Sequence, residues 1–84
     1  MKNISFPVLN VKLVDINKLK KNNYNPNRIA PTEFKLLQIS IEEDGFTQPI
    51  VTYYDENSDE YIIVDGFHRF LIGMKLKLAE LPIV

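Results

Sequence analysis

Hydrophobic and polar positions alternate in some stretches of this chain and recur at helical spacing in others, which separates the expected strands from the expected helices. Alternation predicts a first strand over Val11–Val14. Two runs rich in β-branched and aromatic residues, Pro49–Tyr54 and Glu60–Val64, flank a short acidic link and therefore predict a hairpin. The apolar segment Leu81–Val84 predicts a last short strand.

Two other segments carry apolar residues at helical spacing. Pro31 suits the first turn of a helix and Gly45 stands where a left-handed C-cap residue belongs, so a helix is expected over Pro31–Asp44. A second helix is expected over Phe67–Leu76, where Gly73 indicates close packing against the sheet. We expect the inward positions to form the core: Leu13, Phe34, Leu37, Ile41, Ile50, Ile62, Val64, Phe70, Leu71 and Met74.

The segment Lys18–Arg28, before the first expected helix, is polar and basic. Its asparagines and Pro26 are typical of turns, so we expect a loop. Two interpretations of its basic side chains remain open: a solvated connection, or one wall of an anion-binding site.

Composition narrows the function classes. The chain has 84 residues, the size of one small domain, and its net charge of −1 gives no general attraction to nucleic acid. The absence of cysteine excludes disulfides, thiolate metal sites and thiol nucleophiles, and a single histidine argues against a histidine-based zinc site. No apolar run reaches membrane-spanning length and no signal-peptide pattern opens the chain, so we expect a cytoplasmic protein with no metal site and no membrane partner.

The segment with the clearest chemistry is Val64–Phe70. A strand ends here, Gly66 turns the chain, and His68 and Arg69 open the second helix. The unpaired N–H groups already make that helix end positive, so cations are unfavourable there unless an anion binds between them. A phosphate would use the N–H groups and the arginine fork together. In the structural alternative, Asp65 caps the helix and the cations are ordinary exposed side chains.

Four motifs follow one another in a specific order. They are Asn25-Pro26-Asn27, Ser40-Ile41-Glu42-Glu43-Asp44-Gly45-Phe46-Thr47-Gln48-Pro49-Ile50, Tyr61-Ile62-Ile63-Val64-Asp65-Gly66-Phe67-His68-Arg69 and Leu78-Ala79-Glu80-Leu81-Pro82-Ile83-Val84. In this order they resemble the N-terminal domain of the ParB/sulfiredoxin superfamily, the ParB-like nuclease domain. The resemblance implies an α+β fold with a small mixed sheet and two main helices. Residues 1–84 would form a single ParB-like N-terminal domain, and the abrupt apolar end predicts that it belongs to a longer protein.

The resemblance also implies a nucleotide site. In this superfamily the glycine turn before the second helix holds the phosphates of a bound nucleotide, so a nucleoside triphosphate with magnesium is the implied ligand. Gly66, His68 and Arg69 match that turn, and Gln48 lies in the matching loop before the hairpin. We expect Asn25, Asn27 and Arg28 on the opposite wall.

Phe67 departs from both relatives. Sulfiredoxins have a catalytic cysteine at this position and ParB proteins have a glutamate, so the phenylalanine excludes sulfinic acid reduction.

The leading hypothesis is a nucleotide- or phosphate-binding ParB-like module that acts on DNA through the full-length protein, in partition, regulation or a phage or mobile-element role. Two alternatives stay open: a nucleotide-dependent phosphotransferase or nuclease, and a protein-interaction domain with a decayed site, using Leu36 and Ile39 as its apolar face. The sequence does not decide whether the chain is an enzyme, and it is compatible with a homo-oligomer.

Overall fold

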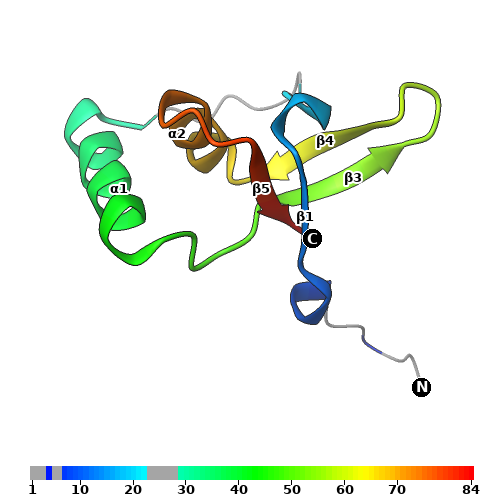
Figure 1. Ribbon diagram of the computed structural model, residues 1–84, viewed down its shortest axis with the longest axis horizontal. Helices are drawn as coiled ribbons and strands as arrows, with labels where there is room; N and C mark the ends of the chain where they lie inside the picture. The colour runs from blue at the N-terminus through cyan, green and yellow to red at the C-terminus, as the bar shows by residue number, and fades with distance from the viewer. Residues whose placement is uncertain (1–3, 5–6, 23–28) are drawn as a thin grey trace.

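The computed structural model describes residues 4, 7–22 and 29–84, and Figure 1 shows how its elements are arranged. The helices are α1 (Pro31–Asp44) and α2 (Phe67–Lys75). The strands are β1 (Lys12–Asp15), β2 (Leu19–Lys20), β3 (Val51–Asp55), β4 (Glu60–Asp65) and β5 (Glu80–Ile83). Short 3₁₀ helices, η1 (Pro7–Asn10) and η2 (Ile16–Lys18), flank β1. The expected α+β class is therefore confirmed.

The strands form two small sheets that a backbone bridge connects. β1 pairs antiparallel with β5, while β4 lies between β2, which is parallel to it, and β3, which is antiparallel. A parallel bridge joins Ile50 to Ile83: the Ile50 N–H donates to the Pro82 carbonyl at 2.9 Å, and the Val84 N–H donates to the Ile50 carbonyl at 3.0 Å. The strand pairing is mixed, as predicted, and β5 contacts both sheets.

The core lies where both sheets meet α2. Its buried residues are Leu19, Ile41, Ile50, Ile63, Phe70, Ile72, Leu81 and Ile83. In the view of Figure 1, α2 lies between the strands and α1. The N-terminus of α2 follows β4 after a single residue, so the turn between them is held by the best-packed part of the molecule.

Gly73 provides the close approach between α2 and β5 that its presence in the helix predicted. A Cβ atom at Gly73 would lie 2.8 Å from Cδ2 and 2.9 Å from Cδ1 of Leu81, and Leu81 is fully buried. Such distances are shorter than van der Waals contact, so only glycine lets the helix lie this close to the strand.

We expect Gly73→Ala to destabilise the domain. The overpacking cost of about 1–3 kcal/mol exceeds the gain of about 1 kcal/mol in helix propensity. Urea denaturation should show a lower midpoint with an unchanged slope. Met74→Ala, which truncates a half-exposed neighbour, is the control and should shift the midpoint less. A stabilised Gly73→Ala variant would contradict this packing.

The prediction that three residues belong to the core is wrong. These residues, Leu13, Val64 and Met74, are 63%, 49% and 53% exposed. Val64 directly follows the fully buried Ile63 along β4, so its side chain lies on the opposite face of the sheet. Leu13 lies on β1, which pairs only with β5 among the described strands. Met74 turns outward because α2 approaches the sheet through Gly73.

The other residues predicted for the core are either buried in the structure or half-buried at the edge of the core. Ile41, Ile50 and Phe70 are buried, as predicted, whereas Phe34, Leu37, Ile62 and Leu71 are half-buried.

Element boundaries agree best where local signals are strong. The first helix spans Pro31–Asp44, as predicted, while α2 ends at Lys75 with Leu76 as its C-cap. The prediction of a loop throughout Lys18–Arg28 is wrong at Leu19–Lys20, which forms β2. A two-residue strand is too short to show a period in the sequence.

Candidate nucleotide-binding turn

Gly66 forms the turn between β4 and α2 and has a left-handed backbone, with φ 93° and ψ 22°. A Cβ atom there would lie 3.4 Å from Cα of Ile50, so the turn also lies close against the backbone that precedes β3. The left-handed backbone favours glycine at this position. Gly66 is the N-cap residue and provides no side-chain cap, so the first N–H groups of α2 lack a partner within the helix. Asp65 does not cap the helix; its carboxylate accepts a hydrogen bond from the Gly66 N–H at 2.8 Å.

Arg69 is held over this turn by Gln48. The Nη2 group of Arg69 donates to Oε1 of Gln48 at 2.5 Å, and Nη1 lies 3.6 Å from the position of a Cβ atom on Gly66. Gln48 comes from the segment between α1 and β3. The structure therefore brings together Gly66, Arg69 and Gln48, as the sequence predicted. Gln48 is the side chain that the structure places in a hydrogen bond with the Arg69 guanidinium.

The imidazole of His68 contacts aromatic rings, although the sequence predicted it in one site with Arg69. Its ring packs edge-on against Phe34 of α1, with centroids 6.4 Å apart, and lies 6.0 Å from the ring of Phe67. The backbone N–H of His68 belongs to the turn, whereas its imidazole contacts aromatic rings. Asn25, Asn27 and Arg28 lie outside the described residues.

The sequence-based site residues did not include Lys21. Its ammonium lies 5.9 Å from the ring centroid of Phe67, the first residue of α2. The basic character of Lys18–Arg28 was the available signal, but the sequence does not tell which of these lysines approaches the turn.

Residues 3–84 match the family model described as the ParB N-terminal domain. The chain belongs to this family. It is 56% identical over 84 residues to the uncharacterized protein YbdM of Escherichia coli (strain K12), covering 92% of this chain and 39% of that protein. It is 31% identical over 74 residues to the probable chromosome-partitioning protein ParB of Borreliella burgdorferi, covering 87% of this chain and 28% of that protein. The chain thus spans well under half the length of these relatives.

Solved structures of ParB and sulfiredoxin share this ParB N-terminal fold. The C-terminally truncated ParB of Caulobacter crescentus complexed with CTP-γ-S has a TM-score of 0.76 at 29% identity, covering 88% of this chain and 42% of that one. The same protein complexed to the centromeric parS site has a TM-score of 0.74 at 29% identity, covering 87% of this chain and 38% of that one. Sulfiredoxin from Arabidopsis thaliana has a TM-score of 0.73 at 20% identity, covering 88% and 81%, which supports the fold alone.

Enzymes also occur among the structural neighbours of this ParB N-terminal domain. A free serine kinase in complex with AMP has a TM-score of 0.72 at 25% identity, covering 88% of this chain and 30% of that one.

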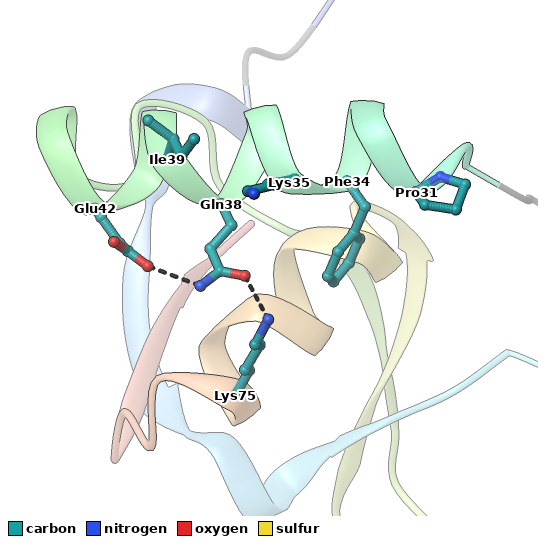
Figure 2. A pocket seen from close by; sticks show the side chains of 7 residues that line it. All are labelled: Pro31, Phe34, Lys35, Gln38, Ile39, Glu42 and Lys75. Atoms are coloured by element: carbon teal, nitrogen blue, oxygen red, sulfur yellow. Dashed lines mark hydrogen bonds between the residues drawn. The ribbon is translucent and has the colours of Figure 1, made fainter.

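Two pockets flank α2 in this ParB N-terminal domain, and the turn residues line neither of them. The first, about 410 Å³, lies between α1 and α2; Figure 2 shows Lys75 donating to Gln38, which donates to Glu42. The second, about 280 Å³, has an apolar floor that includes Leu19 and Phe70 and a basic rim that includes Lys21.

No helix in the described part of the chain is both long and apolar enough to cross a membrane. Within the same residues, no group of three or more acidic, histidine or cysteine side chains is placed to hold a metal ion.

A charged cluster lies at the far end of the β3–β4 hairpin. Asp59 accepts hydrogen bonds from the Lys18 ammonium, at 2.8 Å, and from the Tyr54 hydroxyl. The hydrogen bond and charge of Lys18 lower the pKa of Asp59, and the hydrogen bonds to Asp59 raise the pKa values of Lys18 and Tyr54. These groups stabilise the hairpin and lie away from the Gly66 turn.

We expect the hairpin to be most stable between acidic and strongly alkaline pH. The Asp59 contribution is present above its ordinary pKa and is lost as the pH falls through its lowered pKa in the folded state. The Lys18 and Tyr54 contributions are present below their ordinary pKa values and are lost as the pH rises through their raised ones. Because all these groups are exposed, the effect should be small and weakened by salt. Amide hydrogen exchange of the hairpin should show it, and an identical pH profile for Asp59→Asn would contradict it.

Proposed function

We propose that this chain is a nucleotide-binding ParB-like module that acts in a cytoplasmic, DNA-related process such as partition, regulation or a phage or mobile-element role. The observation that supports this most is the Arg69 guanidinium, held by Gln48 over the left-handed Gly66 turn. The family relationship adds support, because a 29% identical ParB structure is a complex with CTP-γ-S.

The phosphates would lie against the start of α2. Their oxygens would accept hydrogen bonds from the N–H groups of the first turn, including that of His68, and from the Arg69 fork. Since no acidic cluster is formed by the described residues, we expect Mg²⁺ to accompany the nucleotide on its phosphate oxygens. Asp65 is the carboxylate beside the turn.

Calorimetric titration of the domain with CTP, ATP and GTP, each with and without MgCl₂, tests the proposal. Saturable binding of at least one triphosphate is expected. If none of the three binds under either condition, the proposal is wrong and the decayed-site alternative gains weight, with exposed Leu36 and Ile39 as its interaction face.

Nucleotide-dependent phosphoryl transfer is the second candidate, favoured by the likeness to the free serine kinase. Such a site needs a base or a metal-holding carboxylate near the phosphates, and Asp65 is the available group. Release of phosphate from a bound triphosphate, lost in Asp65→Asn, would favour this candidate over a binding module.

DNA is the proposed partner of the full-length protein, and residues 1–84 alone should bind it weakly and without sequence preference. Lys18 and Lys20 form ion pairs with Asp59 and Glu60, so the basic surface is partly neutralised. Each phosphate contact adds about 0.9 to the log–log salt slope, and with few contacts we expect a magnitude below about 3. Anisotropy titrations at several salt concentrations measure it. Tight, salt-resistant, sequence-selective binding would contradict the expectation.

A further inference from the structure

We infer that Lys21 is an additional phosphate-binding residue, which recognises the distal phosphates of a nucleoside di- or triphosphate. This inference rests on the nucleotide site proposed above and concerns its preference for the number of phosphates. Lys21 lies outside the four sequence motifs, in the basic segment Lys18–Arg28.

The Lys21 ammonium lies over the ring of Phe67. The ammonium lies 5.9 Å from the ring centroid, within the range of a cation–π contact. The ring is itself stacked on Phe70, with centroids 6.0 Å apart and an interplanar angle of 30°, and Phe70 is a core residue. Phe67 directly follows Gly66. A packed aromatic ring thus holds a cation next to the turn where the phosphates are proposed to bind.

Phe67 is the first residue of α2 and carries no group that reacts with phosphate or binds a metal ion. The face of its phenyl ring attracts a cation. Phe67 therefore acts as a support that orients Lys21.

Lys21 also differs from its neighbours in what its charge contacts. Lys18 and Lys20 are paired with carboxylates, and Lys12 donates to the Tyr61 hydroxyl at 2.8 Å. Within the described residues, no carboxylate pairs with Lys21. A cation that is exposed, oriented and unpaired with an acid is suited to an anionic ligand.

The geometry assigns different phosphates to the two cations. Arg69 is held by Gln48 and presents its fork at Gly66, so one phosphate is bound there. Lys21 follows the last residue of β2, and its ammonium lies over the ring of Phe67, the residue after Gly66. A monophosphate on the turn contacts Arg69 alone, whereas a longer phosphate chain also reaches Lys21.

Titration of the wild type and Lys21→Ala with CMP, CDP and CTP, and with the adenosine series, tests the inference. We expect Lys21→Ala to weaken triphosphate binding at least about tenfold, the scale of a charged hydrogen bond, with little change for the monophosphate. Lys21→Arg should restore the preference for triphosphate. Phe67→Leu, which keeps an apolar side chain but removes the ring, should reduce the preference partly. Lys20→Ala is the matched control, because Lys20 pairs with Glu60 at 3.3 Å, and it should bind like the wild type.

The outcomes separate the inference from the proposed function. Nucleotide binding that depends on Arg69 but is identical in Lys21→Ala for all phosphate numbers would overturn the inference alone. Equal losses for mono-, di- and triphosphate would also overturn it, since a general charge effect has no preference for distal phosphates. Absence of binding by the wild type to every nucleotide would overturn both.

Discussion

Replacing Arg69 with alanine is expected to weaken nucleotide binding by about 1.5–3 kcal/mol, which is about 10- to 150-fold. The guanidinium provides charge-assisted hydrogen bonds from a side chain that Gln48 already orients, so its loss removes both the charge and the fixed geometry. Calorimetry at one fixed salt concentration, with the triphosphate that the wild type binds best, measures the effect.

Two control variants isolate the cause. Arg69→Lys keeps the charge but loses the planar fork and should recover only part of the affinity. Lys75→Ala removes a cation from the last turn of the same helix, where Lys75 contacts Gln38, and should leave affinity nearly unchanged. Equal affinities of wild type and Arg69→Ala would refute the assignment of the site.

Replacing Ile63 with alanine is expected to destabilise the domain by about 2–5 kcal/mol. Its side chain has no exposed surface and belongs to the cluster with Leu19, Ile50 and Leu81, so truncation leaves a cavity that the surrounding strands cannot fill. A domain of this size is stabilised by only about 5–15 kcal/mol, so we expect the variant to be partly unfolded at 37 °C. Urea denaturation followed by circular dichroism measures the loss.

Ile62→Ala is the matched control because it removes the same atoms one residue earlier, from a half-buried position on the other face of β4. It should cost clearly less than Ile63→Ala. A larger cost at Ile62 would mean that the hairpin register is shifted by one residue.

The comparison of Ile62 with Ile63 also shows which features of the fold could not be predicted from the sequence. Pro31 and Gly45 mark the ends of α1 by their own backbone preferences, so the helix could be located from the sequence. In the run Tyr61–Val64, apolar residues occupy both sets of alternating positions. The local pattern therefore does not show which face of the strand is buried. Packing against Leu81 of β5 and Leu19 of β2 determines the buried face, and these contacts join distant parts of the chain.

The candidate site likewise has features that could be predicted from the sequence and features that could not. Gly66 and Arg69 were identified because a turn and a helix start are local features and the motif around them is specific. The ring contact of His68 with Phe34, and that of Lys21 with Phe67, depend on how α1 and β2 pack against α2. No spacing in the sequence reports those contacts.

The position of β5 has a consequence for how the domain forms. β5 pairs with β1 near the start of the chain, and the residues at its end bond to Ile50 and Thr52. The buried side chains of Leu81 and Ile83 therefore reach their partners only after β5, which follows all the other described strands, has been synthesised. Contacts of such high sequence separation slow folding, because the loop between them must close first. On the ribosome, the hairpin and both helices would remain incompletely packed until β5 leaves the exit tunnel, and the Gly66 turn would gain its full support only then.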